Sequence, residues 1–139
     1  MTVTQEVRKA VEDTTSWIDD LMQRLGWHES DHAYLALVAG LHALRDALGR
    51  DEAISLGAQL PPLLRGLYYE GWHPGQHAAA RGRGAFLERI HDGVHRSPAI
   101  DAERVARALL ALLAARLSAP ELENAKAATP PALHYLWPD

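Results

Sequence analysis

The second half of this chain repeats the first half at a fixed, ungapped offset of 69 positions. Residues 17–68 align with residues 86–137, and eleven of the 52 aligned pairs are identical, against roughly four or five expected by chance. The strongest block sets residues 41–44 against residues 110–113. Two copies of one unit are expected to share one local fold, so this duplication constrains the architecture before any other feature does.

The composition predicts one globular domain over residues 1–139, because a chain of this length with 47% hydrophobic residues can bury a core. A net charge of −4 opposes attraction to phosphate backbones, so we expect no nucleic-acid partner. The absence of cysteine excludes disulfides, zinc–thiolate sites and cysteine nucleophiles. Residues 1–20 are polar, and the longest apolar tract, residues 105–117, is too short to span a bilayer. We therefore expect a cytoplasmic protein with no membrane contact.

Apolar residues recur at helical spacing and no segment alternates in the manner of a strand, so the sequence predicts an all-α fold. The first helix is expected over about residues 4–25, with Val7 and Val11 on its apolar stripe. Gly26 is placed to end it as the C′ residue, and Asp31 is placed to begin the second helix as its N-cap.

Prolines and capping residues predict the shorter helices. Asp51 is expected to cap a short third helix, which Pro61 ends, and Pro62 suits the first position of a fourth helix. In the second half, Asp101 is expected to cap the counterpart of the second helix. Ser118 begins an S-x-x-E sequence that matches a capping box.

These elements predict a single compact helical bundle of about eight helices, built from two tandem pseudo-symmetric repeats. Repeat one covers about residues 4–70, a glycine-rich linker covers about residues 71–84, and repeat two covers about residues 85–139. Each repeat has an open apolar face, so the two gain most by packing these faces together about a pseudo-twofold axis. Side-by-side stacking of the repeats, as in a solenoid, is the alternative arrangement.

Residues 57–72 read Gly-Ala-Gln-Leu-Pro-Pro-Leu-Leu-Arg-Gly-Leu-Tyr-Tyr-Glu-Gly-Trp, and this block resembles the bacterial family catalogued as domain of unknown function 2267. Residues 25–27, 41–46 and 133–138 are also similar to that family. The resemblance implies a small, cytoplasmic, all-helical bacterial protein with no assigned activity, and it supplies no catalytic residues.

A cluster of aromatic and charged residues on the fourth helix is the candidate partner-binding site, because tyrosine, tryptophan and arginine are enriched at interaction hot spots. In the alternative interpretation, Tyr68 and Trp72 only close the end of the bundle, and Arg65 pairs with an acidic side chain. The second repeat has His134 in place of Arg65, so part of the cluster is not needed for packing alone. The candidate residues are Arg65, Tyr68, Tyr69, Glu70 and Trp72.

Histidine pairs spaced four residues apart are the other candidates, since this spacing places two imidazoles on one helix face. Of these, only the last pair falls on an expected helix, where Glu88, His91 and His95 are the candidate metal ligands. We nevertheless expect no metal or other cofactor, and we expect the half-buried His42 to bond to a backbone carbonyl or a carboxylate. The pairs are His28 with His32, His73 with His77, and His91 with His95.

The sequence identifies no catalytic residue, and it favours a protein that is not an enzyme. We expect a non-catalytic binding or regulatory module that acts through protein–protein contacts with an unknown partner, which includes the case of a homo-oligomer. The alternative is a sensor or enzyme that holds a metal or small ligand between the repeats.

Overall fold

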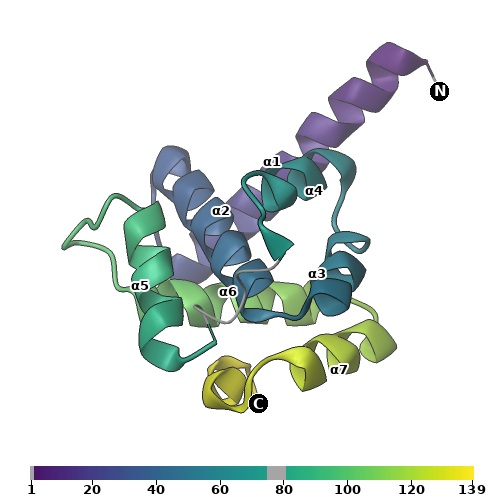
Figure 1. The fold of residues 1–139 in the computed structure, drawn as a ribbon. Coiled ribbons are helices and arrows are strands. Elements are labelled where there is room, and N and C mark those ends of the chain that lie inside the picture. Colours follow the sequence, from purple (N-terminus) through teal and green to yellow (C-terminus); the bar gives the residue numbers. More distant parts are fainter. Residues whose placement is uncertain (1, 75–80) are drawn as a thin grey trace.

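A computed structural model describes residues 2–74 and 81–139, and within them the fold is all-helical, as predicted (Figure 1). In this described part of the chain, no helix combines the length and the apolar character needed to cross a membrane. The elements in chain order are α1 (Val3–Leu25), α2 (Ser30–Ala47), α3 (Arg50–Gly57), α4 (Pro62–Tyr69), α5 (Arg83–Gly93), α6 (Ala102–Arg116), α7 (Ala119–Ala128) and the 3-10 helix η2 (Pro131–Leu136).

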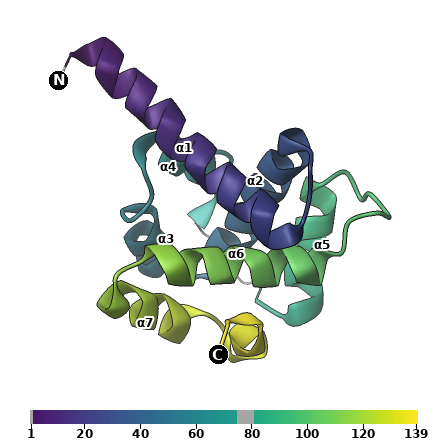
Figure 2. The same cartoon turned by 180° about the vertical axis from the view of Figure 1, so that it is seen from behind.

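Helices α2 and α6 form the middle of the bundle, and both contact α1 and α5 (Figures 1 and 2). Helix α2 is buried on most of its circumference, as helices in the centre of a bundle are. Helix α4 covers α2 and α1, η2 covers α6, and α3 packs against α7. The buried side chains of these elements form one hydrophobic cluster.

Contacts between helices of one half recur between the helices that the 69-residue offset aligns with them. The contact of α1 with α2 matches that of α5 with α6, and the contact of α1 with α6 matches that of α5 with α2. At the centre, a Cβ on Gly40 would lie 2.8 Å from Cδ2 of Leu109, and these two residues are aligned by the offset. A residue that meets its own equivalent is expected at an axis relating two halves. The pseudo-twofold relation itself remains a prediction.

Two of the predicted helix caps are present and one is wrong. Gly26 has a φ of 70° and its N–H closes the end of α1, as expected of a C′ glycine. Asp101 accepts hydrogen bonds from two backbone N–H groups in the first turn of α6. Asp31 is not an N-cap, because α2 already begins at Ser30 and Glu29, two residues before Asp31, takes that position. Asp31 instead lies in the first turn, where its negative charge complements the helix dipole.

Of two further cap predictions, the one for Asp51 is wrong, and the one for Ser118 is confirmed in its position only. Gly49 precedes α3 as its N-cap, so Asp51 lies in the first turn. Ser118 takes the N-cap position of α7 without a side-chain hydrogen bond, and Glu121 instead lines a hollow between α3 and α7. Pro62 does begin α4, as predicted, whereas the corresponding segment of the second half forms the 3-10 helix η2.

The first three turns of α1 extend beyond the bundle (Figures 1 and 2). Val3, Val7 and Val11 are 76%, 59% and 51% exposed, whereas Trp17, farther along the same helix, is buried. Val7 and Val11 thus belong to the predicted helix, but their part of the apolar stripe is exposed. The physical reason is that no other helix lies beside this part of α1.

The second half differs at this point within the residues that the structure describes. Its counterpart of α1 is α5, and α5 begins at Arg83, which the offset aligns with residue 14. Only the part of α1 from about residue 14 onward therefore packs within the bundle. The preceding three turns are an extension of this helix.

Replacement of Gly93 by alanine tests how closely α5 and α2 approach. A Cβ on Gly93 would lie 2.4 Å from the Cβ of Ala39 and 3.1 Å from its Cα, so the two helices must move apart. We expect Gly93→Ala to lower the free energy of unfolding by about 1–3 kcal/mol in urea titrations.

The matched control is Gly66→Ala on α4, where a new Cβ would meet no atom within 4 Å. Alanine is the better helix former, so this variant should gain about 0.5–1 kcal/mol. Equal effects of the two substitutions would show that the α2–α5 contact is looser than described.

Candidate partner-binding site

Arg65 holds the end of the preceding helix rather than facing a partner. Its guanidinium donates hydrogen bonds to the backbone carbonyls of Gly57 at 3.0 Å, Ala58 at 3.4 Å and Leu60 at 2.9 Å. These carbonyls lie at and just beyond the C-terminus of α3, where helix carbonyls have no partner within the helix. The acidic partner expected for Arg65 was wrong, because backbone carbonyls take its place.

Tyr68 is fully buried and presents no surface to a partner in this structure. Its hydroxyl donates a hydrogen bond to the carbonyl of Ala53 at 2.7 Å. Burial raises the pKa of Tyr68, so the hydroxyl keeps its proton and remains a donor. Tyr68 therefore ties α4 to α3 from within the core.

Tyr69, Glu70 and Trp72 form the part of the cluster that reaches solvent. The ring of Tyr69 lies against Gly57, where any Cβ would collide with it. The ring centroid of Trp72 is 5.5 Å from that of Tyr69, and both rings are half-buried. The side chain of Glu70 is exposed. The solvent-facing part of the predicted site is therefore Glu70 and the outer edges of two rings.

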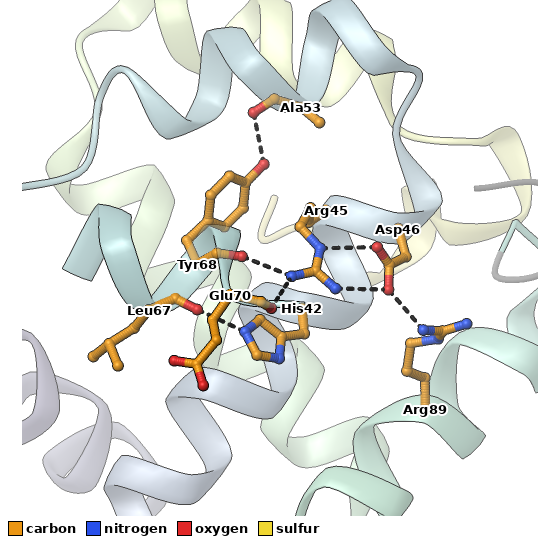
Figure 3. Close-up of polar contacts among 8 residues, drawn as sticks. All are labelled: His42, Arg45, Asp46, Ala53, Leu67, Tyr68, Glu70 and Arg89. Carbon is orange, nitrogen blue, oxygen red and sulfur yellow. Dashed lines mark hydrogen bonds and ion pairs between the residues drawn. The ribbon is translucent and has the colours of Figure 1, made fainter. Parts of the chain in front are cut away.

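Beneath α4 lies a buried ion pair between Arg45 and Asp46, neighbours on α2 (Figure 3). Arg45 Nε donates to Oδ1 of Asp46 at 2.8 Å, and Nη2 donates to Oδ2 at 3.0 Å. The remaining Nη1 donates to the carbonyls of Tyr68 and Glu70, each at 2.8 Å. Arg45 thus satisfies carbonyls at the C-terminal end of α4 from inside the protein.

Two further side chains extend this network (Figure 3). Arg89 on α5 donates from Nη1 to Oδ2 of Asp46 at 2.6 Å. Nε2 of His42 lies 2.7 Å from the carbonyl of Leu67, so this nitrogen carries the proton and donates it. The expectation of a half-buried His42 bonded to a carbonyl is confirmed. Burial lowers the pKa of His42 although the carbonyl bond opposes this effect.

In the second half, a different side chain binds the backbone carbonyl at the aligned position. His134, which the offset aligns with Arg65, lies with Nε2 2.5 Å from the carbonyl of Thr129. Thr129 is aligned with Leu60, whose carbonyl Arg65 binds. Because arginine in one half and histidine in the other make the same carbonyl contact, the role of Arg65 is structural. No local sequence pattern marks the contact of Arg45 and Asp46 with α4.

The candidate metal ligands do not converge. Glu88 accepts a hydrogen bond from Arg96 at 2.9 Å, and His91 Nε2 lies 3.2 Å from the carbonyl of Ser97. His95 follows α5 with a φ of 59°. Among residues 2–74 and 81–139, no three histidine, aspartate or glutamate side chains are placed to share a metal ion.

Of the other two histidine pairs, the structure describes only one in full. His77 lies outside the described residues, while its pair partner His73 is exposed after α4. His28 and His32 instead line one hollow together with His95, which comes from the other half of the chain. No sequence pattern joins His95 to His28 and His32, because their proximity depends on how the two halves pack.

A second hollow, of about 380 Å³, lies at the root of the projecting part of α1. Asp13 and Trp17 of α1 line one wall, and Pro61, Pro62 and Arg65 line another. One residue of the predicted site is thus next to the exposed part of α1.

A family model described as an uncharacterized conserved protein, domain of unknown function 2267, matches residues 14–136. No curated protein matches the chain. The family match begins where α1 enters the bundle, so the projecting turns with Val3, Val7 and Val11 lie outside it.

Removal of the Asp46 carboxylate should destabilise the protein strongly, because it leaves the guanidinium of Arg45 buried beside apolar side chains. We expect Asp46→Ala to lower the free energy of unfolding by about 3–5 kcal/mol in denaturant titrations. Arg89→Ala is the comparison, and because that side chain is 41% exposed its loss should cost less than about 1 kcal/mol.

The second half carries Ala114 and Ala115 at the positions of Arg45 and Asp46. The double variant Arg45→Ala, Asp46→Ala should therefore cost less than the sum of its single substitutions, by about 0.5–3 kcal/mol. Strict additivity would show that the two side chains act independently.

The lowered pKa of His42 predicts a pH dependence of stability. The unfolded chain binds a proton near the ordinary histidine value of 6.5, whereas the folded chain binds it only at lower pH. This contribution to stability is complete above 6.5 and is lost as pH falls toward the folded-state pKa. Unfolding in urea from about pH 8 to about pH 5 should show a flatter profile for His42→Gln than for the wild type. Parallel profiles would contradict the assignment.

Proposed function

Because this chain belongs to the uncharacterised family called domain of unknown function 2267, we propose its function from its surface: it is a non-catalytic module that binds another protein. The projecting part of α1 is the docking element in this proposal. The single observation that carries it is the uncovered apolar stripe of Val3, Val7 and Val11.

The stripe has the form of a helix face that lacks its partner. Val3, Val7 and Val11 step by four residues, so they lie along one side of α1 and lead into the face that Trp17 buries. Exposed apolar side chains that are contiguous, rather than scattered, mark interaction surfaces. A helix with such a face typically docks into an apolar groove of its partner.

The charges around the stripe are balanced rather than of one sign. The projecting turns carry Arg8 and Lys9 together with Glu6, Glu12 and Asp13, and Lys9 pairs with Asp13 at 2.7 Å. Such a segment has no strong net field toward anionic or cationic surfaces. Apolar contact therefore supplies the binding energy in this proposal, and the charges set its orientation.

The hollow at the root of α1 is a separate feature from the stripe. It brings Pro61, Pro62 and Arg65 beside Asp13 and Trp17 of α1, whereas Val11 is not among its lining residues. Of the five predicted site residues, the exposed Glu70 and the half-buried Tyr69 and Trp72 remain at the surface as additional contacts. The docking surface proposed from the structure thus moves from the predicted cluster on α4 to the exposed part of α1.

A photo-crosslinking residue in place of Val3 tests the proposal in cells that naturally contain the protein. We expect a discrete protein adduct, which Val7→Ser combined with Val11→Ser abolishes. Both valines lie outside the bundle, so each change should alter the free energy of unfolding by less than about 0.5 kcal/mol.

The matched control combines Arg8→Ser with Glu12→Ser, which changes two exposed residues of the same turns and leaves the net charge unaltered. This control should retain the adduct. An adduct with a second copy of the chain would identify the partner as itself. Absence of any adduct, or its survival in the valine variant, would refute the proposed docking element.

A further inference from the structure

The hollow that joins His28, His32 and His95 lies between the two equivalent connectors of the bundle. One connector links α1 to α2 and the other links α5 to α6, and together they enclose a space of about 500 Å³. Small-molecule sites typically have volumes of about 300–1,000 Å³ and favour the seams between structural units.

The floor of this hollow is apolar and its rim is polar. Trp27, Leu35, Val94 and Ile100 provide the apolar surface, and each packs against or belongs to the core. Three imidazoles stand at the rim, from His28, His32 and His95. An apolar pocket with a few convergent polar groups has the composition of a ligand site.

Two of the three imidazoles are available to a ligand. Within the described residues, the ring nitrogens of His28 and His95 have no hydrogen-bond partner. Nδ1 of His32 lies 3.2 Å from the carboxylate of Glu29, which leaves its other nitrogen available. A neutral imidazole offers one donor and one acceptor, so the rim can bond to both kinds of group.

His95 adopts a backbone conformation that is costly for a residue with a side chain. Its φ is 59°, and the aligned residue of the first half is Gly26, with a φ of 70°. Glycine takes this left-handed conformation freely, whereas other residues pay for it. The chain thus keeps an imidazole at the rim of the hollow where glycine would be more stable.

The lining residues restrict the charge of the ligand. They include no lysine or arginine, so the hollow offers a carboxylate or a phosphate no permanent positive charge. The carboxylate of Glu29 is already paired with His32, which reduces its attraction for a cation. A neutral molecule with an apolar ring and hydrogen-bonding groups on its edge fits both the floor and the rim.

We propose that this hollow binds a small, neutral, planar aromatic or heteroaromatic molecule whose edge bears hydrogen-bond donors and acceptors. The ring lies on the apolar floor near Trp27, and the imidazoles of His28 and His95 bind its polar edge. This site is separate from the projecting part of α1 and does not depend on the proposed docking function.

Three probes of one shape and different charge test the proposal: neutral benzamide, anionic benzoate and cationic benzamidine. Each is titrated into isotope-labelled protein while the NMR signal of the Trp27 indole N–H is followed. We expect a saturable shift with benzamide, and affinities about tenfold weaker for the two charged probes. Absence of a saturable benzamide shift would refute the site, and tighter binding of a charged probe would refute the assigned ligand class.

Two variants separate binding from folding. His95→Gly should melt at the same or a higher temperature, because glycine accepts the left-handed conformation, and should bind benzamide about tenfold more weakly. Ala99→Trp places a large ring in the hollow from an exposed position and should abolish the shift.

His73→Ala removes an exposed histidine that is not among the lining residues, and it should bind benzamide as the wild type does. If His95→Gly and Ala99→Trp both retained wild-type affinity, the probe would bind elsewhere and the proposal would fail.

Discussion

The contact between Gly40 and Leu109 sets how closely the two central helices approach, and the positions of the other helices depend on it. Because Gly40 has no side chain, a methyl group of Leu109 occupies the space that a Cβ would need. Helices α2 and α6 can then contact each other while each also contacts α1 and α5. A large residue opposite a small one at aligned positions gives the close packing that two identical residues could not provide there.

The two halves hold their last helices in place with different polar groups. The first half fixes its last helix with buried charges, in which Arg45 binds the carbonyls of Tyr68 and Glu70. The second half has alanine at the aligned position and instead bonds Trp137 Nε1 to the hydroxyl of Thr129 at 3.2 Å. The first solution also links α2 and α4 to α5 of the second half, through Asp46 and Arg89.

The sequence predicted the helices well because their signals are local. Apolar spacing, Gly26 and Pro62 act within one or two turns, and the structure has the corresponding elements. The site was harder to predict because a residue type suited to a partner surface is also suited to a core, as Tyr68 is. The spacing of Val7 and Val11 identified an apolar face, but only the three-dimensional packing shows that nothing covers it. The meeting of His28 with His95 likewise depends on contacts between the halves.

Helix α1 contains neither glycine nor proline between its ends, so it runs without a flexible joint from its exposed tip into the core. Its first eleven residues span about 16 Å at the helical rise. A molecule held at the tip would therefore keep a fixed direction and distance relative to the bundle. A force on the exposed end of α1 would act on the core at Trp17, whose ring lies under the guanidinium of Arg116. Helix α1 therefore positions a bound molecule rigidly, whereas a flexible linker would only keep it nearby.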